Sequence, residues 1–147
     1  MAEKTIDIAS PILSRNERLA DQLRRRFKET GTYVINVLSS PGSGKTTTIL
    51  GTNERLRDKA GLRCAVIEGD IASDVDAITM KEAGMPAIQI NTGGLCHLEG
   101  NMIMEAVDAF DRAVGLENID VIFIENVGNL VCPVDFDLGE NLAIMIL

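Results

Sequence analysis

A three-layer α/β fold, with helices covering both faces of a mostly parallel sheet, is predicted for this chain by three features of its sequence. Continuous apolar runs rich in Val, Ile and Leu recur along the chain, as expected for strands buried on both faces. These runs alternate with helical patterns of roughly 10–16 residues, the order typical of parallel sheets. With 147 residues, 46% of them hydrophobic, the chain is also large enough for one domain with a substantial core.

The first helix is expected to begin at Ser10, which can cap it, with Pro11 in its first turn, and to end before Gly31. Three apolar residues recur at a spacing of four on one face of this helix: Leu19, Leu23 and Phe27. The arginine run 24–26 is interpreted as part of a solvated face rather than as an anion-binding patch. We expect residues 1–32 to form a helical segment that packs on the rest of the chain.

The remaining elements alternate along the chain. Strands are expected over residues 33–38, 62–70, 86–91, 119–126 and 142–147. Helices are expected after the segment 39–47 as far as about residue 60, then over residues 74–83 and 99–114. In a parallel sheet, ligands bind beyond the carboxyl ends of the strands. Four loops should therefore hold the functional site: residues 39–46, 68–74, 91–99 and 125–133.

Composition and charge exclude several classes of function. The formal net charge is -8, so a nucleic-acid partner is not expected, because phosphate backbones call for a basic face. No segment resembles a signal peptide or approaches the roughly 18 apolar residues of a membrane span. The three cysteines are widely spaced and odd in number, which favours reduced thiols over a disulfide framework. We expect a cytoplasmic protein with no membrane partner.

The segment SSPGSGKTT lies between an expected strand and an expected helix, the context of a phosphate-binding loop. Its two glycines allow successive N–H groups to turn toward phosphate oxygens, and the helix N-terminus adds positive charge. Lys45 can reach the β- and γ-phosphates, and the Thr46 hydroxyl can ligate Mg²⁺. The expected nucleotide-binding residues of this segment are Gly42, Ser43, Gly44, Lys45, Thr46 and Thr47. Ser39 replaces the first glycine of the usual motif, so the match is to a relaxed form.

Acidic residues beyond two other expected strands complete this site. Asp70 and Glu125 stand at strand ends, where a carboxylate can hold Mg²⁺ directly or through water. Gly128 suits a backbone amide that approaches a γ-phosphate. Asp74 has two interpretations, because it can orient water or simply stabilise a helix start, and the second applies more strongly to Asp76.

The segment GGLCHLEG contains Cys96 and His97, the chain's one histidine, as neighbours. A metal ion needs several converging ligands, and two adjacent residues cannot complete its coordination. Cys132 lies in a later loop that should leave the same edge of the sheet. A second copy of the chain, water or Glu99 would have to complete the shell. The alternative is that the pair is incidental, as is expected for Cys64, which lies inside a strand.

Four segments, in this order, resemble the hydrogenase nickel-incorporation GTPase family, HypB: VLSSPGSGKTT, VIEGDIASDVDA, NTGGLCHLE and IENVGNLVCPVDFDLGE. The resemblance runs over about residues 36–141, and the Cys-His pair with a later Val-Cys-Pro is specific to that family. It implies a P-loop NTPase fold and slow hydrolysis of GTP with Mg²⁺. It also implies a homodimer that holds nickel or zinc between two subunits. The family delivers nickel to the large subunit of nickel–iron hydrogenase alongside HypA, a small zinc-containing partner.

The resemblance also implies roles for individual residues. The nickel or zinc ligands would be Cys96, His97 and Cys132. The Mg²⁺ ligands would be Thr46, Asp70 and Glu125. Together with the interpretation of Asp74 as a residue that orients water, we expect Lys45, Asp74 and Glu125 to be the catalytic residues.

The chain departs from the family pattern in two places. It has neither clustered cysteines nor a histidine-rich tract near its N-terminus, so no additional nickel site or nickel storage is expected there. It also contains no Asn-Lys-x-Asp motif, the motif that recognises guanine in the family. We expect a P-loop GTPase domain over residues 33–147 that is truncated before the base-recognition motif and lacks the last strands and helices of the fold.

Two other functions stay open at this point. A P-loop ATPase or small-molecule kinase would carry the same phosphate-binding loop with an incidental Cys-His pair. A truncated, inactive dimerisation module would bind no nucleotide. Thiolate and imidazole ligands accept nickel and zinc alike, so the sequence leaves the working metal open.

Overall fold

The computed structural model describes residues 10–69 and 74–147, excluding the side chains of residues 10 and 74–77. The helices are α1 (Ser10–Thr30), α2 (Lys45–Ala60), α3 (Asp74–Glu82) and α4 (Gly100–Val114). The strands are β1 (Tyr33–Ser39), β2 (Cys64–Glu68), β3 (Ala87–Gln89), β4 (Val121–Glu125) and β5 (Leu142–Ile146). Two short 3₁₀ helices were not predicted: η1 (Leu116–Asn118) and η2 (Cys132–Asp135). Strand β3 is also shorter than the predicted strand over residues 86–91.

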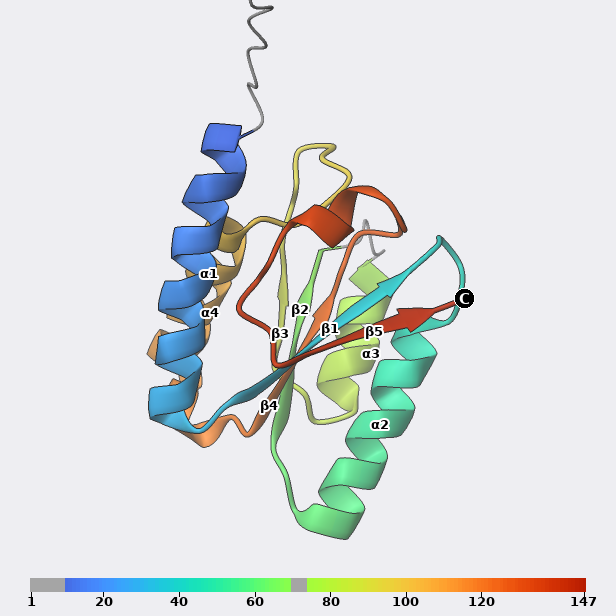
Figure 1. The fold of residues 1–147 in the computed structure, drawn as a ribbon. Helices are drawn as coiled ribbons and strands as arrows, with labels where there is room; N and C mark the ends of the chain where they lie inside the picture. The colour runs from blue at the N-terminus through green and yellow to red at the C-terminus, as the bar shows by residue number, and fades with distance from the viewer. Residues whose placement is uncertain (1–9, 70–73) are drawn as a thin grey trace, which may run out of the picture.

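The five strands form one sheet in the order β3-β2-β4-β1-β5, and every pair is parallel. Helices α1 and α4 cover one face of the sheet, and α2 and α3 cover the other (Figure 1). This arrangement confirms the predicted fold class. Because parallel strands point the same way, the loops after their carboxyl ends gather at one edge of the sheet. We call it the carboxyl edge; β1, β2 and β4 end there, at Ser39, Glu68 and Glu125.

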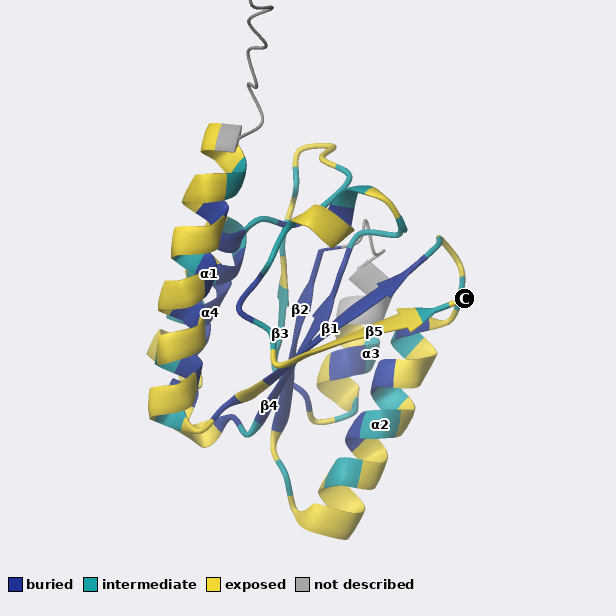
Figure 2. Ribbon diagram, in the orientation of Figure 1, coloured by how far each residue is buried: buried dark blue, intermediate teal, exposed yellow. Residues whose placement is uncertain are grey.

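Two apolar clusters, one on each face, fix the central strands. Strand β4 is buried along its whole length (Figure 2), and its side chains point alternately to the two faces of the sheet. Ile122 and Ile124 belong to the cluster under α1 and α4, whereas Val121 and Phe123 belong to the cluster under α2 and α3. Burying one such side chain contributes about 1.5–3 kcal/mol to folding. The ends of these strands are therefore held firmly in place.

The edge strand β5 is held differently. Three of its apolar residues are exposed to solvent: Leu142 at 43%, Ile144 at 37% and Met145 at 48% (Figure 2). Backbone pairing with β1 attaches it, and the side chain and backbone of Asn141 bond the backbone of Val34 at 2.8 and 2.9 Å where the two strands start. This strand depends on hydrogen bonding more than on burial.

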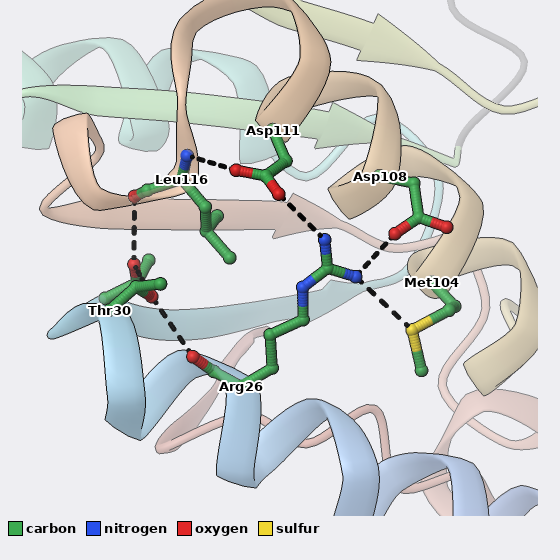
Figure 3. Close-up of polar contacts among 7 residues, drawn as sticks. Arg26, Thr30, Met104, Asp108, Asp111 and Leu116 are labelled. Carbon is green, nitrogen blue, oxygen red and sulfur yellow. Dashed lines mark hydrogen bonds and ion pairs between the residues drawn. The ribbon is translucent and has the colours of Figure 1, made fainter.

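Helix α1 is fixed to α4 by apolar packing and by Arg26 (Figure 3). The Arg26 guanidinium contacts the Asp108 carboxylate at 2.5 Å and the Asp111 carboxylate at 3.3 Å. Asp111 also accepts the backbone N–H of Leu116, and this bond, with Arg26, lowers the pKa of its carboxyl group. The interpretation of the arginine run as a solvated face was therefore wrong for Arg26, which joins two helices.

In the part of the chain that the structure describes, none of the helices has both the length and the apolar character needed to cross a bilayer.

Candidate functional site

The phosphate loop, residues 39–47, joins β1 to α2 at the carboxyl edge. Gly42 and Gly44 have φ angles of +73° and +89°, a left-handed conformation that residues with a Cβ rarely adopt. Open space surrounds the position where a Cβ would stand at either glycine. Ser43 donates to the Ser40 carbonyl at 2.8 Å and closes the turn. The loop is a shaped, open cradle of the kind that admits phosphate groups.

The side chain of Glu125, at the end of β4, meets the start of α2 beside this cradle. Lys45 is buried although it is charged, with 4% of its surface exposed. The Thr46 hydroxyl donates to Glu125 at the end of β4, at 2.9 Å. A hydroxyl and a carboxylate at this distance are two oxygen ligands of the kind that Mg²⁺ prefers. The arrangement fits a nucleotide phosphate chain with its Mg²⁺.

Glu68 was not singled out from the sequence as a site residue, yet it is fully buried at the end of β2. Its Cα is paired in register with that of Glu125 on β4, so the two carboxyl groups stand on adjacent strands. An acidic last residue in the otherwise apolar strand CAVIE is the signal that identifies it. Burial of a charged group is costly unless it has partners, so such a position indicates a functional role or a dedicated structural contact.

The loop after β4 is packed against the phosphate loop. A Cβ at Gly128 would lie 3.1 Å from Cα of Pro41, so the backbones of the two loops approach closely here. Asn126 is fully buried and donates from its side chain to Asn36 at 3.1 Å. These contacts connect the predicted γ-phosphate position at Gly128 to the core of the sheet.

Other predicted residues are described less fully. Asp70 lies outside the described residues. Asp74 is the first residue of α3, and its side chain is outside the description, as is that of Asp76. Thr47 lies in the first turn of α2 and is exposed.

Cys96, His97 and Cys132, which we call the thiol cluster, come together from two loops of the carboxyl edge. The Sγ atom of Cys96 lies 3.6 Å from Nδ1 of His97. Hydrogen bonding between the thiols of Cys96 and Cys132 raises the pKa of Cys96 above its usual value. Cys64, by contrast, is buried in β2, and burial raises the pKa of its thiol to about 11. The chain's three cysteines are thus one inert core residue and one pair of neighbouring thiols.

The His97 ring is oriented by two neighbours. Its Nε2 lies 3.0 Å from a Glu99 carboxylate oxygen, and its ring is stacked on Phe136 with centroids 3.9 Å apart. A carboxylate only accepts hydrogen bonds, so Nε2 carries a hydrogen, and Nδ1 faces the thiol of Cys96. Phe136 was not identified from the sequence, because its place beside His97 depends on the path of a later loop.

The thiol cluster does not form a complete metal site by itself. Within residues 10–69 and 74–147, no group of three or more His, Cys, Asp or Glu side chains is arranged to hold a metal ion. Two thiols and an imidazole nevertheless match the ligands that nickel and zinc accept. Three donors are also one short of a tetrahedral shell.

A contact between Gly69 and Leu98 joins the end of β2 to the segment that carries Cys96 and His97. Gly69 follows β2, and its Cα lies so close to the Leu98 side chain that an added Cβ would stand 2.5 Å from it. Leu98 is fully buried and follows His97 in the chain. The Gly69 N–H also donates to the Glu125 carbonyl at 2.8 Å. The end of β2 therefore touches both the nucleotide side and the segment that carries Cys96 and His97.

Comparison with known proteins identifies a family for this fold and site. Residues 33–141 match the family described as CobW/HypB/UreG, nucleotide-binding domain. The match includes the phosphate loop and both loops of the thiol cluster.

Individual relatives resemble the chain over nearly its whole length. It is 44% identical to the hydrogenase/urease maturation factor HypB of Helicobacter hepaticus, over 99% of this chain and 58% of that protein. It is also 44% identical to the hydrogenase maturation factor HypB of Escherichia coli K12, over 98% of this chain and 48% of that protein. The chain thus spans about half the length of the curated relatives it matches.

Solved structures agree with these relationships. The crystal structure of HypB from Helicobacter pylori in complex with nickel has a TM-score of 0.78 and 42% identity, over 89% of this chain and 59% of that chain. The HypB structure from Archaeoglobus fulgidus has a TM-score of 0.80 and 38% identity, over 91% and 62%. The chain belongs to the CobW/HypB/UreG family of nucleotide-binding domains, and the relatives it resembles here are HypB proteins.

Proposed function

We propose that this chain is the nucleotide- and metal-binding part of a GTP-dependent nickel chaperone that serves hydrogenase maturation. The main support for the proposal is the position of Cys96 at the edge that also holds the phosphate loop: its Sγ lies 3.6 Å from Nδ1 of His97, and the Cys132 thiol raises its pKa. The names of the curated relatives, hydrogenase or hydrogenase/urease maturation factors, support the same biological role. The nickel complex of the H. pylori relative supports nickel as the cargo.

On the nucleotide side, the backbone of residues 42–44 and the Lys45 ammonium would bind the β- and γ-phosphates of GTP. Thr46 and Glu125, now joined by a hydrogen bond, would each take a position beside Mg²⁺ together with Asp70. The bound ion would neutralise the charge that develops on the phosphates. Lys45, Asp74 and Glu125 are the residues we assign to hydrolysis, with Asp74 orienting the attacking water.

On the metal side, the two thiols and Nδ1 of His97 would bind nickel, with zinc as a competitor for the same donors. Because three donors do not complete the coordination, we propose that two copies of the chain meet at this cluster and share the metal. Apolar side chains beside the thiols support such a contact. Val131 is 76% exposed, Val134 59% and Leu95 42%.

The proposed protein partners follow from nickel as the cargo. We propose that nickel passes to the large subunit of nickel–iron hydrogenase with HypA as a second maturation factor, in the cytoplasm. The loop after β4 would link the nucleotide to the metal. It begins at Glu125, which bonds Thr46, and its Gly128 lies against Pro41 of the phosphate loop. It then leads to Cys132. A change of nucleotide at one end would shift the thiol at the other.

Metal titration of single-cysteine variants tests this function. We expect Cys96→Ala and Cys132→Ala to lose most of the Ni²⁺ and Zn²⁺ affinity of the wild-type chain, measured against a chromophoric chelator. Cys64→Ala is the matched control, because this buried thiol lies in β2 away from the cluster. Wild-type affinity in both cluster variants would contradict the proposal, and stronger binding of ATP than of GTP would contradict its nucleotide half.

A further inference from the structure

The geometry points to Asn16 of α1 as the residue that positions the thiol cluster, a role that rests on the proposed metal function. Asn16 lies on the N-terminal helix, outside residues 33–141, and it is not one of the predicted metal ligands. We infer that its side-chain amide holds the two metal-bearing loops at a fixed separation.

The amide of Asn16 bridges two backbones that are far apart in the sequence. Its Oδ1 accepts the N–H of Gly100 at 2.6 Å, and its Nδ2 donates to the carbonyl of Asp137 at 2.7 Å. Gly100 is the third residue after His97, and Asp137 follows Phe136, which stacks on the His97 ring. One side chain therefore connects the Cys96–His97 segment to the segment that runs on from Cys132.

Because Asn16 is buried, its two hydrogen bonds matter more than those of a surface residue would. Asn16 is 5% exposed, and its bond with Gly100 is buried whereas its bond with Asp137 is partly buried. A buried amide that loses a partner costs roughly 1–3 kcal/mol, because its desolvation is no longer compensated. Both halves of the amide are used here, and each half specifies the position of one loop. An apolar residue at position 16 would pack on α4 without fixing either loop.

Neighbouring contacts hold the bridge in register. A Cβ at Gly100 would lie 3.1 Å from Oδ1 of Asn16 and 3.0 Å from Cβ of Leu19, so the absence of a side chain lets α4 start against α1. Two turns further along α1, Arg24 forms an ion pair with the Asp137 carboxylate at 2.6 Å. Arg24 and the N–H of Gly139 favour the charged form of Asp137, whose carboxyl pKa is lowered although burial opposes this. Asp137 is thus fixed to α1 through its backbone and through its side chain.

Asn16→Leu tests the assignment, with Thr32→Val as the matched control. Thr32 is also buried and polar, but it bonds the carbonyl of Ile119, at the opposite end of the sheet. We expect Asn16→Leu to weaken Ni²⁺ binding roughly 10–100-fold, the range for lost outer-shell partners, and Thr32→Val to leave it unchanged. GTP affinity should stay at the wild-type value in both variants. Asn16→Leu should also alter the nickel–thiolate absorption band, a signature that global destabilisation does not move.

A disulfide equilibrium, which needs no metal, tests the role of Asn16 independently of the proposed metal function. In glutathione buffers, the two thiols of Cys96 and Cys132 reduce one oxidised glutathione to two reduced molecules and become a disulfide, which needs no metal. We expect the equilibrium constant of this reaction to fall at least tenfold in Asn16→Leu, because the loops separate. An unchanged constant together with unchanged Ni²⁺ affinity would overturn the role of Asn16. If Cys96→Ala binds Ni²⁺ as tightly as the wild-type chain, the proposed function would be overturned instead.

If Asn16→Leu does not fold, Gly100→Ala replaces it. The new methyl group would press on Oδ1 of Asn16 from the loop side. The same decrease in Ni²⁺ affinity is expected, and wild-type affinity in this folded variant would contradict the assignment.

Discussion

The phosphate loop and the thiol cluster lie at the same edge of the sheet but are built in opposite ways. Residues 39–47 are one continuous segment between a buried strand and a helix, and their turn is fixed by local backbone conformation. The thiol cluster joins two loops through side chains: a pair of thiols, a stacked ring and the buried amide of Asn16. The turn of the phosphate loop depends on neighbours in sequence, whereas the thiol cluster depends on neighbours in space. Substitutions within residues 39–47 should therefore affect the phosphate loop alone. The thiol cluster should also respond to substitutions far from it in the sequence.

The largest expected effect is on the phosphate loop. Lys45→Ala should lower GTP affinity by about 100-fold, since charge-assisted hydrogen bonds contribute roughly 1.5–3 kcal/mol each. Fluorescent-nucleotide titration measures this change. Ni²⁺ affinity, measured without nucleotide, should not change if the two sites are built independently.

Lys59→Ala is the control, because Lys59 lies in the last turn of the same helix and is exposed. Equal nucleotide affinity in Lys45→Ala and Lys59→Ala would show that the cradle does not bind the phosphates as described.

A smaller effect is expected at the edge of the thiol cluster. Glu99→Ala removes the acceptor of Nε2 of His97 and should lower Ni²⁺ affinity about tenfold, at the lower end of outer-shell effects. Because His97 is the chain's one histidine, nitrogen NMR reports its ring without ambiguity. The wild-type neutral ring should carry its hydrogen on Nε2, and Glu99→Ala should populate both tautomers. A wild-type ring protonated on Nδ1 would contradict the orientation described for His97.

The smallest effect concerns stability at high pH and uses the third thiol. Burial raises the pKa of Cys64 to about 11, above the ordinary value of 9.0 that applies when the chain is unfolded. A raised folded pKa means that the stabilisation is complete below pH 9 and is lost as the pH rises toward 11. Urea unfolding at several pH values should show less loss of stability over this range in Cys64→Ala than in the wild type. An identical loss in both would remove Cys64 as the cause.

Alkylation sharpens the same contrast between buried and clustered thiols. At pH 8, iodoacetamide should modify Cys96 and Cys132 in the folded chain and reach Cys64 only after unfolding. Rapid modification of Cys64 in the native chain would contradict its burial.

The contrast between the two sites also explains how much of them the sequence predicts. The phosphate loop and its helix are predictable because glycine conformation, strand pattern and helix start are local properties of residues 33–60. Cys96, His97 and Cys132 can be nominated, because strand ends share one edge, but their partners cannot. Phe136 and Asn16 act through contacts made between distant segments, and no periodicity marks them. The pairing of Arg26 with α4 likewise depends on which elements become neighbours.

We propose that these separately built sites influence each other through the loop from Glu125 to Cys132 and the contact between Gly69 and Leu98. The most direct test of this influence is the Ni²⁺ affinity of the wild-type chain with GTP and Mg²⁺, with GDP and Mg²⁺, and without nucleotide. We expect different nickel affinities in the GTP and GDP states. By thermodynamic linkage, nickel must change the affinity for GTP by the same factor by which GTP changes the affinity for nickel. Equal nickel affinity in all three states would contradict the proposed influence.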